Sequence, residues 1–196
     1  MTAAPKRPGR KAGEVRLIGG QWRRSKLPVA DRPGLRPTPD RVRETLFNWL
    51  GQDLKGWRVL DAFAGSGALG FEAASRGASE VQLLESDPQL VASLQASRMR
   101  LGASTLQVER TDALAWMARA AAGSFDLVLL DPPFDSPLAG PALAQAARLA
   151  APGAYVYMES AAPIDVCPQA LHMHRSLKAG AVHAQLFLRH EIQLES

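Results

Sequence analysis

The sequence has almost no cysteine and no long hydrophobic segment. Cys167 is its single cysteine, which excludes an internal disulfide framework and fits a reducing compartment. No apolar run approaches the roughly 18 residues that a membrane helix needs. The opening residues, MTAAPKRPGRKAGE, also lack the apolar core of a signal peptide. We therefore expect a cytoplasmic protein that is not bound to a membrane, and its 46% hydrophobic content predicts a globular domain.

Positive charge is concentrated in the N-terminal third of the chain. Residues 1–60 carry 14 Lys and Arg against 5 Asp and Glu, a net charge of +9, whereas residues 61–196 carry 9 against 14, a net charge of −5. Such an asymmetry indicates that the N-terminal part binds a polyanion. Residues 1–13 are rich in Pro, Gly, Lys and Arg and predict a disordered basic tail, for which a purely solubilising role is the alternative.

Residues 14–37 are predicted to form a basic β-hairpin followed by a linker. The segments EVRLI and QWRRSKL flank Gly19-Gly20, a pair that favours a two-residue hairpin turn. The three prolines between residues 28 and 37 then indicate irregular structure. We expect this hairpin to lie outside the core of the domain that follows, with an ordinary solvated hairpin as the alternative to a binding surface.

Residues 38–196 are predicted to form one folded domain. Thr38 and Pro39 are typical of the N-cap and first residue of a helix that extends to Gly51. Beyond it the sequence predicts alternating strands and helices, and the last two strands have no long helix between them. This pattern predicts an α/β fold with a mostly parallel seven-stranded sheet, helices on both faces and an antiparallel C-terminal edge. Strand candidates lie at 58–63, 81–85, 106–110, 125–130, 154–159, 171–178 and 182–190, and helix candidates at 68–76, 88–101, 113–122 and 140–150.

A glycine-rich loop follows the first strand of this sheet. In DAFAGSGALG, residues 61–70, Gly65, Gly67 and Gly70 satisfy the spacing G-x-G-x-x-G, and Glu85 lies at the end of the next strand. The glycines allow the backbone to approach a ligand closely, and the acid can accept hydrogen bonds from ribose hydroxyls. The loop therefore predicts a site for a nucleoside cofactor, with a tight strand–helix turn as the alternative. It does not by itself identify the cofactor.

Two further acids favour S-adenosylmethionine over a dinucleotide. Asp61 precedes the glycine loop, near the place for a cationic methionine group, and Asp112 follows the third strand, where an adenine amino group can be held. A dehydrogenase would also need a substrate domain, for which too little chain remains after the sheet. His172 and His174 alternate along a presumed edge strand, so we expect no metal site.

The segment LVLLDPPFD, residues 127–135, ends a buried strand in an unusual way. Asp131 is followed by Pro132 and Pro133, neither of which can donate a backbone hydrogen bond, and then by the large apolar Phe134 in a loop. A simple strand terminator with one exposed phenylalanine is the structural alternative.

These motifs together resemble those of class I S-adenosylmethionine-dependent methyltransferases. DPPF resembles the [DN]-PP-[FYW] motif of enzymes that methylate exocyclic amino groups. RLIGGQWRRSKL, LRPTPDRVRETLFNWL, DAFAGSGALGFEA and LLDPPF follow one another as in the RsmD family, which methylates N2 of a guanine in bacterial 16S rRNA. The resemblance covers residues 14–191. It implies a Rossmann-like fold, S-adenosylmethionine as cofactor and 16S rRNA in the small ribosomal subunit as partner, and we expect a monomer.

The resemblance also implies residue roles. The Asp131 carboxylate and the Pro132 carbonyl would accept the N–H bonds of the target amine, with Pro133 keeping the turn rigid and Phe134 stacking on an extruded base. The cofactor would contact Asp61, Phe63, Ala64, Gly65, Gly67, Glu85 and Asp112, and Arg36, Pro37 and Thr38 would close over it. The basic hairpin would contact RNA phosphates and stack one ring through Arg16, Trp22, Arg23, Arg24 and Lys26.

Three alternative functions remain open. One is another exocyclic-amino methyltransferase, acting on DNA adenine or on a protein glutamine, although such relatives often carry Asn where this chain has Asp131. A second is a non-catalytic RNA-binding module that keeps the same fold. A Rossmann-type oxidoreductase is a third alternative, which the missing substrate domain disfavours.

Overall fold

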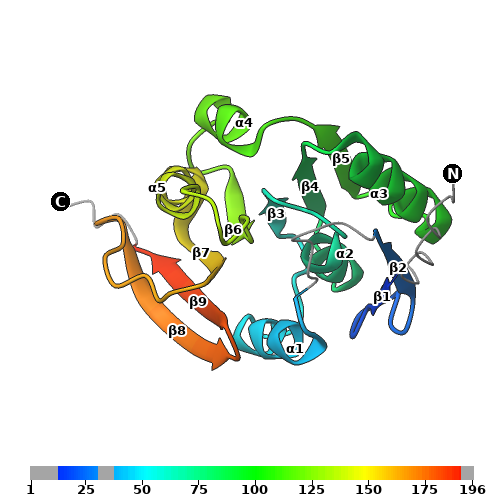
Figure 1. Ribbon diagram of the computed structural model, residues 1–196, viewed down its shortest axis with the longest axis horizontal. Coiled ribbons are helices and arrows are strands. Elements are labelled where there is room, and N and C mark those ends of the chain that lie inside the picture. Colours follow the sequence, from blue (N-terminus) through cyan, green and yellow to red (C-terminus); the bar gives the residue numbers. More distant parts are fainter. Residues whose placement is uncertain (1–12, 31–37, 191–196) are drawn as a thin grey trace, which may run out of the picture.

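The computed structural model describes residues 13–30 and 38–190 (Figure 1). The described residues form a two-stranded hairpin, a seven-stranded sheet and five helices. The hairpin strands are β1 (Gly13–Arg16) and β2 (Lys26–Val29), and the sheet strands are β3 (Arg58–Asp61), β4 (Glu80–Glu85), β5 (Leu106–Arg110), β6 (Phe125–Leu130), β7 (Ala150–Ser160), β8 (Leu171–Ala179) and β9 (Val182–Arg189). The helices are α1 (Asp40–Trp49), α2 (Ala68–Ser75), α3 (Pro88–Leu101), α4 (Ala113–Arg119) and α5 (Ala139–Leu149).

The large sheet has the strand order β5-β4-β3-β6-β7-β9-β8. Strand β3 pairs in parallel with β4 and β6, whereas β9 pairs antiparallel with β7 and β8. This order confirms the predicted Rossmann-like class I methyltransferase fold, including its antiparallel C-terminal edge. The connection reverses direction between β3 and β6, which is where ligands bind in open α/β sheets.

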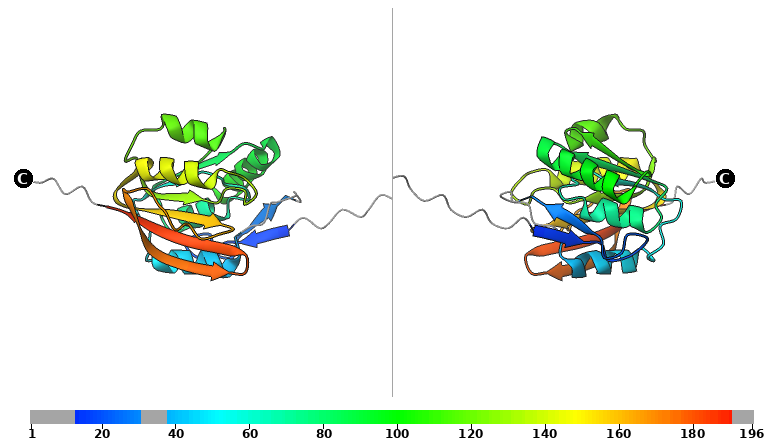
Figure 2. Two further views of the ribbon diagram at one scale, coloured as in Figure 1. Left: turned by 60° about the vertical axis from the view of Figure 1, so that its left-hand side comes forward. Right: turned by 90° about the vertical axis from the view of Figure 1, so that its right-hand side faces the viewer.

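Helices cover both faces of the sheet, and each face has its own hydrophobic core (Figures 1 and 2). Helices α1 and α2 and the hairpin pack on one face, and α4 and α5 pack on the other. The side chains of β6 alternate between the two cores, with Leu127 and Leu129 in the first and Val128 and Leu130 in the second. A strand covered on both sides needs apolar residues at every position, which explains the uninterrupted run LVLL.

The prediction of a two-residue hairpin turn at Gly19-Gly20 is wrong. Its strands pair with Arg16 opposite Lys26, so residues 17–25 form a long connection between them. This connection packs against the end of α2, where Gln21 N donates to Ser75 O at 2.8 Å. A Cβ atom on Gly20, whose φ is +73°, would lie 1.8 Å from the Ser75 carbonyl oxygen. Gly20 is therefore needed for close packing on a helix.

The apolar side of the hairpin belongs to the core. Val15, Leu17, Leu27 and Val29 are buried in the same cluster as the apolar faces of α1 and α2. The expectation that the hairpin lies outside the core is therefore wrong for these side chains. Removing the apolar side chains of the hairpin would expose part of the main core, whereas its exposed charged residues can be changed without that cost.

Helix α1 begins later than predicted. Asp40 is its first residue and Pro39 is its N-cap, without a side-chain capping bond. The Thr38 hydroxyl donates instead to Glu159 Oε1 of β7 at 2.7 Å. The prediction that Thr38 caps the helix is wrong, because its hydroxyl donates its hydrogen bond to a buried carboxylate.

Some predictions fall outside the described residues. These include nearly all of the basic tail 1–13, the linker residues Arg36 and Pro37, and the last residues of the chain. Within the described ranges, none of the helices has the length and hydropathy that a membrane crossing requires.

Candidate active site

The glycine loop between β3 and α2 is held against the end of β4. Ala64 N donates to Leu84 O at 2.9 Å, and Gly65 N donates to Glu85 Oε2 at 2.9 Å. The Phe63 side chain is half-buried and packs against the core on the α4–α5 face. The structure thus brings together the loop and the acid that the sequence predicts as one cofactor site.

Gly67 has a conformational role at the start of α2. It is the N-cap residue and has a left-handed backbone, with φ of +80°. A Cβ atom there would lie 2.6 Å from Leu94 Cδ2 and 2.7 Å from Phe71 Cδ2. These atoms belong to the protein, so they require a glycine here whether or not a ligand is present.

Asp61 lies beneath the first turn of α2. Its side chain is buried, and Oδ2 accepts a hydrogen bond from Gly70 N at 2.9 Å. Gly70 allows this approach, because a Cβ atom would lie 2.2 Å from Leu83 Cδ2. Burial raises the pKa of Asp61 to about 7, and the nearby Glu85 and Glu159 carboxylates contribute to the rise. Asp61 therefore stabilises the end of the glycine loop through its hydrogen bond with Gly70. Its direct contact with a cofactor stays a prediction.

Glu85 and Asp112 lie at the ends of neighbouring strands. Glu85 Oε1 accepts from Ser86 N at 2.8 Å and from Asp87 N at 2.9 Å. Asp112 is exposed and caps α4 by accepting from Ala115 N at 2.8 Å. A carboxylate oxygen has two lone pairs, so both groups retain acceptor capacity for ribose hydroxyls and an adenine amine. The backbone bonds fix their orientation before any ligand arrives.

The DPPF segment leaves the sheet directly after β6. Asp131 is half-buried, Pro132 is buried, and Phe134 is 41% exposed. The Pro133 carbonyl accepts hydrogen bonds from the backbone and the side chain of Ser136, which closes the turn. Burial raises the pKa of Asp131 well above its usual range, and the Glu159 and Asp61 carboxylates raise it further.

Sequence reasoning missed Tyr157 and Glu159. Leu130 pairs with Met158, so the next step along these parallel strands places Asp131 beside Glu159. Glu159 is 2% exposed, and its Oε1 accepts from the Thr38 hydroxyl at 2.7 Å and from the Tyr157 hydroxyl at 3.0 Å. The signal for Glu159 was present, because an acid ends the buried strand AYVYMES as Asp61 and Glu85 end theirs.

Three carboxyl groups therefore converge at one end of β3, β6 and β7. Asp61, Asp131 and Glu159 are close enough to influence one another's ionisation. In their ionised forms these groups can accept the N–H bonds of an amino-bearing ligand, since a carboxylate is an acceptor only. Among residues 13–30 and 38–190, no group of three or more His, Cys, Asp or Glu is arranged to hold a metal ion. The centroids of the His172 and His190 rings lie 4.6 Å apart, so His172 packs against another side chain.

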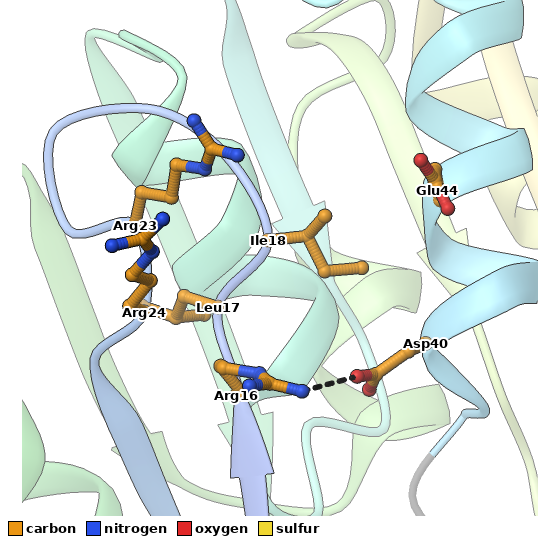
Figure 3. Close-up of a pocket in the computed structure, with 7 residues that line it drawn as sticks. All are labelled: Arg16, Leu17, Ile18, Arg23, Arg24, Asp40 and Glu44. Carbon is orange, nitrogen blue, oxygen red and sulfur yellow. Dashed lines mark ion pairs between the residues drawn. The ribbon is translucent and has the colours of Figure 1, made fainter.

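A second feature is an open pocket between the hairpin and α1 (Figure 3). Arg16, Arg23 and Arg24 line it from the hairpin side, and Asp40 and Glu44 line it from α1. Its volume is about 260 Å³. The three arginines are exposed, so the structure gathers most of the predicted RNA contacts on one surface.

The other two predicted RNA contacts differ from each other. Trp22 is half-buried and packs against the core, so only part of its ring can meet a ligand. Lys26 is exposed and lies 2.6 Å from the exposed Glu14 carboxylate. A surface ion pair of this kind is weak and leaves the lysine free to exchange partners.

Comparisons with known proteins match most of the chain. A family model described as "Conserved hypothetical protein 95" matches residues 15–188. The Ribosomal RNA small subunit methyltransferase D of Escherichia coli (strain K12) is 41% identical over 189 residues, which is 94% of each sequence. The protein of the same name from Haemophilus influenzae is 44% identical over 153 residues, or 76% of this chain and 79% of that one. The solved structure of Escherichia coli yhhF is 39% identical with a TM-score of 0.81, and the match covers 91% of this chain and 99% of that one.

The matches include both the hairpin and the sheet. They confirm the resemblance that the sequence motifs predict. The chain belongs to the RsmD family, the family of ribosomal RNA small subunit methyltransferase D.

Proposed function

We propose that this protein transfers the methyl group of S-adenosylmethionine to the exocyclic N2 amine of a guanine in 16S rRNA of the small ribosomal subunit. The observation that carries the proposal is the position of Asp131, directly after β6 at the point where the strand order reverses. There it faces the ligand-binding edge of the sheet, one strand away from the glycine loop. The family and the names of the relatives support ribosomal RNA as the substrate.

The chemistry explains why an acid and two prolines stand at this position. The lone pair of an exocyclic guanine amine is delocalised into the ring, which makes the nitrogen a poor nucleophile. An acceptor aimed at its N–H bonds draws the nitrogen towards pyramidal geometry and localises the lone pair. The Asp131 carboxylate is that acceptor, with the Pro132 carbonyl as the second. The rigid turn keeps both oxygens in place, which reduces reorganisation during the reaction.

The residues around the glycine loop fit S-adenosylmethionine. Gly65 presents its backbone close to the end of β4, and the oriented carboxylates of Glu85 and Asp112 suit a ribose diol and an adenine amine. When bound, this cofactor supplies a methyl group made electrophilic by a sulfonium. Phe134 offers an exposed ring on which an extruded base can stack.

Glycine at position 67 is expected to be necessary for cofactor binding. Gly67→Ala would place a Cβ atom 2.6 Å from Leu94 at a φ of +80°, so the loop has to shift. Strain and overpacking of this kind each cost roughly 1–3 kcal/mol, which predicts about 10-fold or greater weakening of S-adenosylmethionine binding. Calorimetry measures it. Gly140→Ala is the matched control, because a Cβ atom there has nothing within 4 Å. Binding by Gly67→Ala within twofold of wild type would contradict the prediction.

The hairpin pocket supplies the RNA-binding surface in this proposal. The three arginines of the pocket and Lys26 lie on or beside the exposed connection between β1 and β2, within the part of the chain whose net charge is +9. Phosphates bind such a surface by releasing counterions, so the affinity depends on salt.

Changing Arg23, Arg24 and Lys26 together to alanine is expected to weaken binding to the small subunit and to flatten its salt dependence. For every phosphate that the variant no longer binds, the slope of log K against log salt falls by a little under one unit. The control changes Arg119, Arg175 and Lys178, three exposed basic residues outside the hairpin. Salt-titrated binding to purified subunits measures the slopes. An unchanged slope in the hairpin variant would move the RNA site elsewhere.

Cofactor affinity is expected to remain normal in the same hairpin variant. The three side chains are exposed, and the apolar residues that join the hairpin to the core stay in place. Calorimetry with S-adenosylmethionine checks this point, and a loss of cofactor binding would mean that the charged side chains support the fold.

A methyl-transfer assay tests the proposed function as a whole. The protein is incubated with S-adenosylmethionine carrying a labelled methyl group and with small subunits, naked 16S rRNA, double-stranded DNA or a glutamine-containing protein. We expect label in the ribosomal RNA and none in DNA or protein. Label in DNA or protein alone would favour the other exocyclic-amino methyltransferases, and no label in any substrate would favour a non-catalytic module.

A further inference from the structure

The Asp131–Glu159 pair is built into the sheet. Asp131 directly follows β6 and Glu159 lies near the end of the neighbouring parallel strand β7, and the register Leu129 to Tyr157 and Leu130 to Met158 places them side by side on the same face. Neighbouring strands are about 4.8 Å apart. Two carboxyl groups on this spacing interact strongly when water is excluded, and Glu159 is 2% exposed.

The two carboxyl groups have different surroundings. Burial raises the pKa of Glu159, and three groups oppose that rise: the Thr38 and Tyr157 hydroxyls, which donate hydrogen bonds to Oε1, and the buried Arg43 guanidinium. Among the described residues, none donates a hydrogen bond to the Asp131 carboxylate. Donated hydrogen bonds stabilise an ionised carboxylate. Glu159 is thus the member of the pair that the fold provides with donors, and Asp131 is the member left for the ligand.

We propose that Glu159 is a positioning residue that keeps Asp131 basic, so that Asp131 takes the proton of the target amine during methyl transfer. This inference rests on the proposed function for the identity of the amine. Glu159 does not touch the substrate in this account and acts through its charge beside Asp131.

The transfer step balances with these groups alone. The amine nitrogen uses its lone pair to form the bond to the methyl carbon as the carbon–sulfur bond breaks, and that electron pair goes to sulfur, which becomes a neutral thioether. The nitrogen then carries an excess positive charge and releases one proton to the Asp131 carboxylate. The methylated amine and the protonated Asp131 are both neutral, and the proton passes to water after the product leaves.

Several other groups act on this pair from the surrounding elements. Asp61 of β3 adds negative charge, and Arg43 of α1 adds positive charge. The hydroxyls of Tyr157 on β7 and of Thr38 before α1 donate hydrogen bonds to Glu159. Arg43 is shared with the carboxylates of Asp40 and Glu72. Its charge therefore offsets only part of the repulsion between the two carboxylates, and burial together with the charges of Glu159 and Asp61 raises the pKa of Asp131.

Glu159→Gln separates the effect of charge from that of structure. Glutamine keeps an oxygen that accepts from Thr38 and Tyr157, but it removes the negative neighbour. The pKa of Asp131 should then fall, and the acid limb of the pH profile of kcat/KM should move to lower pH. The plateau kcat should fall about 10-fold because Asp131 becomes a weaker base. This loss is smaller than the roughly 10²–10⁴-fold rate enhancement that a general base typically contributes. KM for the small subunit should change less than twofold.

Carbon-13 NMR of the aspartate carboxyl groups tests the pair without any substrate. The Asp131 carboxyl signal is assigned by its absence from the spectrum of Asp131→Asn. Its change with pH is then followed in wild type, in Glu159→Gln and in Asp135→Asn. Asp135 is an exposed acid in the same loop, and its removal should leave the titration of Asp131 unchanged because solvent screens its charge. Circular dichroism checks that each variant folds.

We expect Asp131 to titrate at lower pH in Glu159→Gln than in the other two proteins. An unchanged titration of Asp131, or an unshifted acid limb in an active Glu159→Gln variant, would overturn the inference. If Glu159→Gln does not fold, Thr38→Val replaces it. This variant removes one hydrogen-bond donor to Glu159, so Glu159 is protonated more readily. The pKa of Asp131 should then fall, by a smaller amount than in Glu159→Gln. A wild-type protein without activity on ribosomal RNA would refute the proposed function. The NMR titration would still show whether Glu159 raises the pKa of Asp131.

Discussion

Asp131→Ala is expected to reduce methyl transfer by about 10²-fold or more, by analogy with removing one hydrogen-bond partner of a transition state. The reason is that the alanine variant cannot accept the N–H bonds of the amine, so the nitrogen lone pair stays delocalised. Cofactor affinity should change only a few-fold, because the glycine loop is held by Leu84 and Glu85 and not by Asp131. Single-turnover kinetics with saturating subunits and calorimetry with S-adenosylmethionine measure the two quantities.

Two further variants show whether the effect depends on the acceptor itself. Asp131→Asn keeps a carbonyl that accepts one hydrogen bond and should therefore retain part of the activity. Asp135→Ala removes an exposed acid from the same loop and should behave as wild type. Turnover by Asp131→Ala at the wild-type rate would rule out the carboxylate as the amine acceptor.

The second large effect is expected in stability. Glu72 of α2 is fully buried and joins the hairpin to two buried arginines. Its Oε2 and Oε1 accept from Ile18 N at 2.8 Å and Gly19 N at 2.7 Å, and the carboxylate lies 3.4 Å from Arg43 Nη1 and 2.9 Å from Arg76 Nη2. Glu72→Ala leaves both guanidinium groups without this partner. Breaking a buried ion pair in this way costs about 3–5 kcal/mol of the free energy of unfolding.

Urea denaturation measures that loss, with Glu44→Ala as the control. Glu44 is an exposed glutamate on α1, and its removal should change the free energy of unfolding by no more than about 0.5 kcal/mol. Hydrogen exchange should also increase at Ile18 and Gly19 in Glu72→Ala, because their amides lose their acceptor. A loss below about 1 kcal/mol would show that Glu72 is not the anchor of the hairpin.

Local patterns in the sequence were sufficient for the sheet and for the contact between the glycine loop and Glu85. The alternation of apolar strands and helices predicts a parallel sheet because each strand has to be covered on both faces. Gly65 and Glu85 were assigned to one site from spacing alone, and the bond from Gly65 N to Glu85 Oε2 confirms that they meet. Such predictions succeed because the relevant residues are close in sequence or lie at corresponding ends of strands.

Contacts between distant segments explain the predictions that failed. Thr38 has the sequence context of a helix cap, but its hydroxyl meets Glu159, which is 121 residues away. Gly20 lies in a pair typical of a tight turn, yet the backbone of Ser75 on α2 decides its role. Neither interaction leaves a local signal, since a hydroxyl or a glycine has several common uses.

Glu159 differs from these cases because its signal was available. It ends a predicted buried strand, and the carboxyl ends of parallel strands meet at one edge of the sheet. Applying that rule to every strand would have grouped Glu159 with Asp61 and Asp131. What the sequence could not provide is the pair of hydroxyl donors, which depends on the register of β7 and on the position of α1.

The most direct test of the account is the identity of the methylated nucleoside. Small subunits from a bacterial strain that lacks its own enzyme of this family are incubated with the protein and labelled S-adenosylmethionine. The 16S rRNA is then digested to nucleosides, which are separated and identified by mass spectrometry. We predict one labelled product, N2-methylguanosine, formed by wild type and strongly reduced with Asp131→Ala. Label on another base, or on a guanine atom other than N2, would contradict the account.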